Sequence, residues 1–188
     1  MRKIPTIFQR DENGNLTDHC HPDCFWVFKG EGRATRKWDG SCCKITPDGG
    51  YWKRREVKDG KPEPGIFELE QQDPITGKKF GWTPVGGGAE DKYFREAIDN
   101  YPGNPPEGTY ELVGPKVQGN PDGFDHHALV PHGKEDVAGC PIHFIDLEKF
   151  FAEHETDIEG IVWWHEDGRK AKIKAKDFGL TRRPQNSP

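Results

Sequence analysis

Short apolar segments separated by turn signals run along the whole chain and predict its secondary structure. Apolar runs of about four to eight residues, bounded by Gly, Pro and Asp, are typical of β-strands. The pattern predicts strands at Ser41–Ile45, at Tyr51–Val57, within Phe67–Val85, and at Thr109–Val113, Ala128–Val130, Ile161–Trp164 and Ala171–Lys174.

Tight turns between these strands predict antiparallel hairpins. Asp48-Gly49-Gly50 predicts a turn between the first two strands, and Asp167-Gly168 predicts one between the last two. Residues 1–30 form a lead-in segment, with a turn signal at Asn13-Gly14-Asn15 and an apolar run at Phe25–Phe28. Lys37 is expected at the mouth of the strand that begins at Ser41.

Two segments have the periodicity of short helices. In Asp91–Asn100, apolar side chains recur three and four residues apart and fall on one face: Phe94, Ala97 and Ile98. Asp146 is expected to be the N-cap of a second helix, whose stripe consists of Leu147, Phe150, Phe151 and His154.

Antiparallel strands with few helices indicate an α+β fold. A length of 188 residues fits one domain. We expect that domain to cover residues 1–180, with a flexible tail over residues 181–188 and no C-terminal accessory domain after Phe178.

The composition describes a polar protein with a modest core. Hydrophobic residues make up 32% and charged residues 31%, yet six Trp and eleven Phe supply enough buriable area to exclude disorder throughout. The net charge of −5 argues against a generically basic nucleic-acid coat. Cationic runs at 53–55, 78–79 and 169–176 are better suited to a localised phosphate site.

The location predicted from the sequence is the cytoplasm, or the host cytoplasm if the protein is viral. The N-terminus lacks a secretory apolar region, and no apolar run is long enough to cross a bilayer. Five cysteines, an odd number, fit free thiols in a reducing compartment. Cys42 and Cys43 are adjacent, so in a strand their side chains point to opposite faces.

One short motif is followed by three others in a fixed order. Lys37-Trp38-Asp39-Gly40 matches a lysine nucleophile pattern, Lys-x-Asp-Gly. The later segments are Glu111-Leu112-Val113-Gly114, Glu159-Gly160-Ile161-Val162 and Lys172-Ile173-Lys174. Period-two spacing places Lys172 and Lys174 on one face of a strand, although a shift to Lys174 and Lys176 keeps the same period.

This ordered set resembles the covalent nucleotidyltransferase superfamily of polynucleotide ligases and capping enzymes. The chain looks most like a small ATP-dependent RNA ligase of phage type, and the run Glu111–Pro121 strengthens that likeness. The resemblance implies a nucleotidyltransferase domain with two antiparallel β-sheets around a nucleotide cleft. It also implies ATP as the AMP donor, Mg²⁺ or Mn²⁺ as cofactor, and RNA 5′-phosphate and 3′-hydroxyl ends as substrates.

The resemblance assigns roles to residues of this sequence. Lys37 would be the nucleophile that takes AMP, and Asp39 would orient it or hold a hydrated metal. Lys172 and Lys174 would hold the α-phosphate, and Glu159 would bind the metal. The remaining nucleotide contacts would be Arg36, Arg54 or in its place Arg55, Glu111 on the ribose hydroxyls, and His127.

His127 is the candidate for the adenine contact because the strand within His126–Val130 carries no Phe or Tyr. Two other functions compete with an RNA ligase: a DNA ligase or guanylyltransferase of the same superfamily, and a nucleotide- or RNA-end-binding module without turnover. The segment His19-Cys20-His21-Pro22-Asp23-Cys24 could supply half of a zinc site. A structural zinc site generally needs a second close-set ligand pair, and only Cys42-Cys43 and the isolated Cys140 and His143 follow, which favours a polar loop with incidental thiols.

Overall fold

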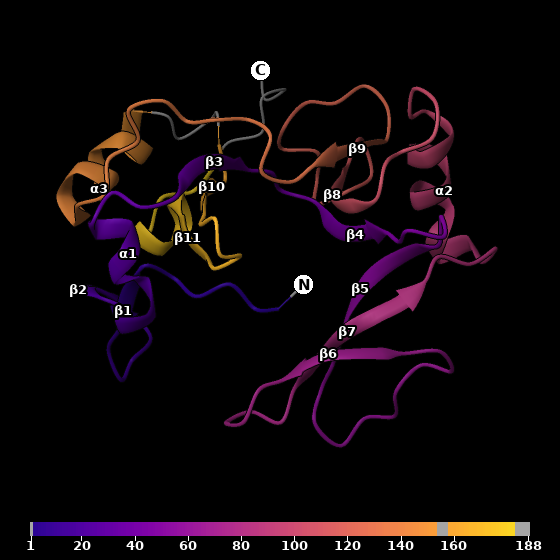
Figure 1. Cartoon of the computed structure of the whole chain (residues 1–188), viewed down its shortest axis with the longest axis horizontal. Helices are drawn as coiled ribbons and strands as arrows, with labels where there is room; N and C mark the ends of the chain where they lie inside the picture. Colours follow the sequence, from indigo (N-terminus) through magenta and orange to yellow (C-terminus); the bar gives the residue numbers. More distant parts are fainter. Residues whose placement is uncertain (1, 154–157, 183–188) are drawn as a thin grey trace. The chain divides into compact units, whose positions relative to one another are not determined.

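The computed structural model describes residues 2–153 and 158–182, which form an α+β structure with mostly antiparallel sheets and few helices. The predicted α+β class is therefore confirmed. The chain divides into two compact units (Figure 1): unit 1 contains residues 1–3 and 39–131, and unit 2 contains residues 4–38 and 132–188. The single domain over residues 1–180 stays a prediction.

Unit 1 is built on a six-stranded antiparallel sheet with the strand order β6-β7-β5-β4-β8-β9 (Figure 1). Its predicted hairpin at residues 41–57 is confirmed, since Cys43 pairs with Lys53 across the turn that contains Gly49. The strands are β4 (Ser41–Ile45), β5 (Tyr51–Val57), β6 (Glu68–Gln72), β7 (Lys79–Pro84), β8 (Gly108–Val113) and β9 (Ala128–Pro131).

A short 3-10 helix, η2 (Ala89–Asp91), and the helix α2 (Lys92–Asp99) accompany this sheet. The predicted stripe of α2 is confirmed, because Ala97 is fully buried and Phe94 and Ile98 pack against the same core. That core takes apolar side chains from neighbouring strands: Cys43, Ile45, Tyr110, Leu112 and Leu129.

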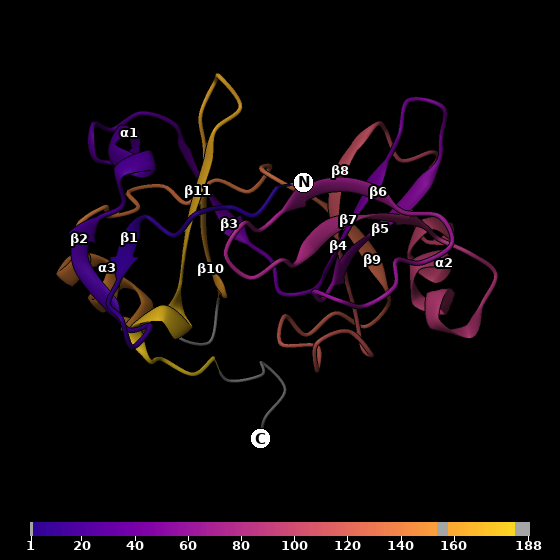
Figure 2. The same ribbon diagram turned by 90° about the horizontal axis from the view of Figure 1, so that it is seen from below.

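Unit 2 contains a three-stranded antiparallel sheet with the order β11-β10-β3, shown with β10 beside β11 in Figure 2. A separate hairpin of β1 and β2 contains the predicted turn at Gly14. The elements are β1 (Phe8–Arg10), β2 (Leu16–Cys20), η1 (Pro22–Cys24), α1 (Phe25–Phe28), β3 (Arg33–Lys37), α3 (Phe144–Glu153), β10 (Gly160–Trp164), β11 (Lys170–Lys174) and η3 (Ala175–Phe178).

One face of this sheet packs into the hydrophobic core of unit 2. Ile161 and Trp163 of β10, with Ala171 and Ile173 of β11, point into a core that is also filled by α3. Leu147 and Phe151 of α3 are fully buried there, as the predicted stripe requires, and Phe150 packs beside them. His154, the last residue of that stripe, lies outside the described residues.

Two sequence predictions are corrected. Asp146 is not the N-cap, since α3 begins at Phe144 and Asp146 lies in its first turn. Lys37 is not at the mouth of the strand beginning at Ser41: it is the last residue of β3, an additional strand that pairs with β10. Arg33–Lys37 has too many charged side chains to be recognised as a strand from apolar alternation.

The N-terminal segment covers the outer edge of β11. The Ile7 amide donates to the Lys172 carbonyl, and the Lys172 amide donates to the Pro5 carbonyl, both at 2.9 Å. Pairing of this kind satisfies the edge strand's backbone groups. β11 thus lies between the N-terminal segment and β10, and both backbone groups of Lys172 bond to the N-terminal segment.

Within residues 2–153 and 158–182, no helix has the length and apolar character needed to cross a bilayer.

Candidate active site

Two predicted site residues of unit 2, Lys37 and Lys174, lie in one row of its sheet. Gly160, the first residue of β10, pairs with Lys37 on β3 and with Lys174 on β11. Cross-strand partners share a face of the sheet. The lysines at positions 37 and 174 therefore flank a residue without a side chain.

Glu159, directly before that row, accepts hydrogen bonds from both lysines. Lys174 Nζ lies 2.7 Å from Glu159 Oε1, and Lys37 Nζ is paired with Glu159 Oε2. Lys37 Nζ also donates to the Trp38 carbonyl at 3.2 Å. One carboxylate is thus shared between two ammonium groups, all three largely buried.

The charges around Glu159 shift its protonation equilibrium. Burial alone would raise the pKa of the carboxyl, but Lys37 and Lys174 outweigh burial and hold the pKa below its usual value. Glu159 is consequently ionised at neutral pH. An ionised carboxylate is the oxygen ligand that Mg²⁺ and Mn²⁺ prefer.

The surroundings of Lys172 disfavour its charged form, whereas those of Glu159 favour the ionised carboxylate. Burial, together with the nearby charges of Lys174 and Lys37, lowers the pKa of Lys172 to about 8. The lysine pairs with Val162 on β10 and is on the same face as Lys174. Lys176 lies beyond the strand, exposed in η3, so the structure separates it from the pair at 172 and 174.

Gly160 has no room for a side chain. A Cβ at this position would overlap the Ile173 carbonyl oxygen and lie 2.9 Å from the Lys174 Cα, both on the neighbouring strand. These are backbone atoms, which cannot rotate away.

Gly160→Ala is therefore expected to push β10 and β11 apart and to cost about 2 kcal/mol of unfolding free energy, in the range typical of overpacking. Urea denaturation would measure this loss. Gly87→Ala is a matched control, because a Cβ at Gly87 would meet nothing within 4 Å. Equal stability of the two variants would contradict the close approach at Gly160.

Arg36 also lies in unit 2, on β3. Its guanidinium carbon is 3.9 Å from the centre of the Trp38 ring, and its Nη1 is 3.2 Å from Glu135 Oε1. The backbone amide of Arg36 donates to the Glu135 carbonyl at 2.8 Å. These contacts fix Arg36 beside Lys37, and its nucleotide contact stays a prediction.

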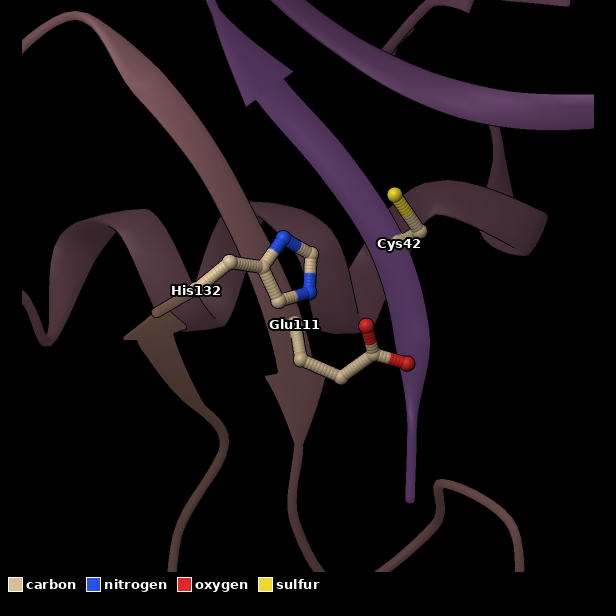
Figure 3. A group of neighbouring side chains, drawn as sticks. All are labelled: Cys42, Glu111 and His132. Atoms are coloured by element: carbon tan, nitrogen blue, oxygen red, sulfur yellow. The ribbon is translucent and has the colours of Figure 1, made fainter. Parts of the chain in front are cut away.

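Unit 1 holds the other predicted site residues, among them Glu111 and Asp39. Glu111 on β8 is the cross-strand partner of Cys42 on β4, and its side chain is buried (Figure 3). Cys42 is half-buried and Cys43 fully buried, which confirms that their side chains take opposite faces. The Asp39 amide donates to Asp122 Oδ2 at 3.5 Å.

Gly40 brings two strands of unit 1 close together. A Cβ on Gly40 would overlap the Leu112 carbonyl oxygen and lie 2.9 Å from Glu111 Cγ. The backbone of Gly40 thus lies directly against that of β8. Gly40 leaves room for the Glu111 side chain.

The sequence did not single out Cys42 as a companion of Glu111. Together the two side chains offer a thiol and a carboxylate, atom types that bind metal ions (Figure 3). They are far apart in the sequence, so no local spacing marks them as a pair.

The alternation on β5 separates its basic side chains. Lys53 is largely buried and ion-paired with Asp91. Arg54 lies with its guanidinium carbon 4.9 Å from the centre of the Phe80 ring, while Arg55 is exposed. Lys53 thus has a packing role, and the choice between Arg54 and Arg55 as nucleotide contact stays open.

His127 connects α2 to the loop before β9. Its ring stacks on Tyr93 with 4.3 Å between centroids, and its Nδ1 lies 2.7 Å from Glu96 Oε2. Its Nε2 accepts the Lys116 amide at 3.4 Å, which places the proton on Nδ1. Tyr93 therefore already covers part of the ring that was predicted to contact adenine, and that contact stays a prediction.

The segment considered for zinc is packed locally. His21 Nδ1 accepts the Asp23 amide at 3.2 Å, which caps η1. Cys24 is fully buried, and Cys20 Sγ donates to the His21 carbonyl.

Comparison with known proteins identifies a relationship for this chain. A model of the RNA ligase 1 family matches residues 97–187, a stretch that includes Glu111, Glu159, Lys172 and Lys174. The chain is similar to RNA ligase 1. Lys37 precedes the matched residues.

Curated relatives carry the same name. RNA ligase 1 of Mus musculus is 28% identical over 78% of this chain and 67% of that protein, and that of Danio rerio is 26% identical over the same shares. RNA ligase 1 of Pongo abelii is 38% identical over 39% of this chain and 25% of that protein. These relatives come from vertebrates, and the phage-type assignment stays a prediction.

Proposed function

We propose that this protein is an ATP-dependent RNA ligase that joins a 5′-phosphate to a 3′-hydroxyl through a covalent lysyl-AMP intermediate. The observation that carries the proposal is the sharing of Glu159 between Lys37 and Lys174, with Lys172 on the same sheet face. The similarity to RNA ligase 1 supports a ligase and an RNA substrate. The nucleotidyltransferase fold and cytoplasmic location belong to the same proposal.

In the first step, the amine of Lys37 attacks the α-phosphorus of ATP. Held by Glu159, Lys37 keeps its proton and is not a nucleophile. The ion pair must therefore open and the proton must leave before attack. The proton passes to solvent, and Lys174 stays beside Glu159 and continues to neutralise its carboxylate.

Glu159 is the residue that would hold Mg²⁺ or Mn²⁺, because its carboxylate is ionised and largely buried. It also lies beside Lys174, which is proposed to bind the α-phosphate. Asp39 is the second proposed metal ligand. When bound, the metal ion would neutralise phosphate charge. Lys172 and Lys174 would hold the α-phosphate from the β11 side and stabilise the charge that develops there.

The later steps reuse the same residues. AMP passes from Lys37 to the RNA 5′-phosphate, and the 3′-hydroxyl then attacks that phosphate and expels AMP. Glu111 would accept hydrogen bonds from the ribose hydroxyls. Arg36, Arg54 and His127 complete the proposed nucleotide contacts.

The proposal is tested by the intact mass of the protein after incubation with ATP and Mg²⁺. A gain of one AMP, reversed by pyrophosphate, is the expected result. An unchanged mass with nucleotide still bound would favour the binding module, and a mass gain with GTP alone would favour a guanylyltransferase. A DNA ligase would join DNA ends in preference to RNA ends.

The assignment of Glu111 gives a prediction about the sugar. A carboxylate that accepts from both ribose hydroxyls rejects a sugar lacking one of them, by roughly tenfold for one lost hydrogen bond. We expect dATP to be a poorer AMP donor than ATP, and Glu111→Gln to reduce the difference. Rates of covalent transfer with each triphosphate would measure it, and equal use of both by the unmodified protein would remove Glu111 from this role.

A further inference from the structure

Strand β11 presents a third lysine on the face that carries Lys172 and Lys174. Lys170 pairs with Trp164 on β10, Lys172 with Val162, and Lys174 with Gly160. Side chains alternate along a strand, so all three lysines share a face, opposite the buried Ala171 and Ile173. The proposed transfer gives roles to Lys172 and Lys174 but not to Lys170.

Lys170 is held along this face by Trp164. Its Nζ lies 4.2 Å from the centre of the Trp164 ring, within the range of a cation–π contact. The indole is itself fixed, since Nε1 donates to Thr35 Oγ1 at 2.9 Å and Thr35 Oγ1 donates to the Val162 carbonyl at 3.0 Å. The ammonium group of Lys170 thus lies over a fixed side chain of the neighbouring strand β10.

The strand order decides on which side a leaving group would go. In-line displacement at phosphorus puts the attacking and leaving atoms on opposite sides. Lys37 is on β3, and the sheet order β3-β10-β11 places β11 across from it. Pyrophosphate expelled by Lys37 would thus leave toward β11, where Lys170 and Lys172 lie.

The spacing along β11 fits a polyphosphate. Residues on one face of a strand are about 6.7 Å apart, twice the rise per residue. Lys170 is one such step beyond Lys172, and two beyond Lys174. Phosphates that follow the α-phosphate of ATP extend over distances of that order.

We propose that Lys170 binds the β- and γ-phosphates of ATP and the pyrophosphate that leaves, with Trp164 as its positioning residue. The proposal rests on the lysyl-AMP chemistry proposed above. In that step Lys37 Nζ, after losing its proton to solvent, bonds to the α-phosphorus. The bond from the α-phosphorus to the bridging oxygen breaks, and its electron pair stays on pyrophosphate, whose charge Lys170 offsets.

The reverse reaction isolates this contact. Enzyme–AMP treated with pyrophosphate returns ATP, and the pyrophosphate concentration for half-maximal rate is expected to rise about tenfold in Lys170→Ala, the loss of one charged contact. Joining of pre-adenylated RNA should stay at the unmodified rate, because no pyrophosphate takes part. Lys149→Ala, which removes an exposed lysine from α3 in the same unit, is the control.

Trp164 is tested by the same measurement. Trp164→Phe keeps a ring under the ammonium group and should stay near the unmodified value, whereas Trp164→Leu should raise the half-maximal pyrophosphate concentration. A role in packing alone would affect joining of pre-adenylated RNA as well. A selective change in pyrophosphate use therefore distinguishes positioning from stability.

Two results would overturn the inference: an unchanged pyrophosphate dependence in Lys170→Ala, or a parallel loss in joining pre-adenylated RNA, which would place the lysine on RNA. If the unmodified protein forms no enzyme–AMP, the proposed function fails by itself. In that case calorimetric binding of an ATP analogue with a methylene bridge between the α- and β-phosphorus still tests Lys170. Equal affinity of the Lys170→Ala variant and the unmodified protein would then reject the contact.

Discussion

Lys37→Arg is expected to abolish transfer of AMP to the protein while leaving its fold intact. Arginine keeps a positive charge that can pair with Glu159, but it is not deprotonated in proteins and so cannot attack phosphorus. The measurement is transfer of label from ATP labelled at the α-phosphate, with folding followed by circular dichroism. The expected loss is complete within the sensitivity of the assay.

Lys37→Ala should also abolish AMP transfer, but it removes one of the two ammonium groups that are paired with Glu159. Glu159 would retain Lys174 as its partner, so the carboxylate would not become an unpaired buried charge. Lys149→Ala serves again as a control with the same loss of charge. Retained label in either Lys37 variant, with normal folding, would move the nucleophile to another lysine.

Lys172→Met is expected to stabilise the protein while depressing AMP transfer. A folded-state pKa of about 8, against an ordinary 10.5, means that the charged form is disfavoured in the fold by about 3 kcal/mol at neutral pH. Methionine has a similar length and no charge, so unfolding free energy should rise by up to that amount. Loss of the phosphate contact should slow transfer roughly a hundredfold or more.

The pH dependence has a defined sign. Because the pKa of Lys172 is lower in the folded protein, its contribution to stability is fully present above pH 10.5 and is lost as the pH falls through 8. The advantage of Lys172→Met should therefore be largest at pH 7 and shrink toward pH 10. Urea denaturation of both proteins at these two pH values would measure it, and a pH-independent difference would contradict the shifted pKa.

The gain in stability and the loss in transfer have one physical cause. The same burial and like charges that destabilise an ammonium group at position 172 provide a preformed site for a phosphate. Binding the negative phosphate would compensate the repulsion among Lys172, Lys174 and Lys37. A residue that weakens the fold without ligand would thus be retained for its contact with ATP.

The sequence by itself determined the local structure of the candidate site. Turn signals at Asp48–Gly50 and Asp167-Gly168 fixed two hairpins, since tight turns depend on residues within a few positions of one another. The period of a strand was sufficient to place Lys172 and Lys174 on one face. The order of the motifs also indicated an RNA ligase before any contact was known.

Only the tertiary structure decided which of these residues meet. Lys37 and Glu159 are separated by 122 positions, and their pairing depends on β3 joining β10, a strand pairing with no local signal. The lowered pKa of Lys172 requires burial beside Lys37 and Lys174. Alternation along the chain determines the face that a side chain takes, whereas packing between distant strands determines its neighbours, its charge state and its chemistry.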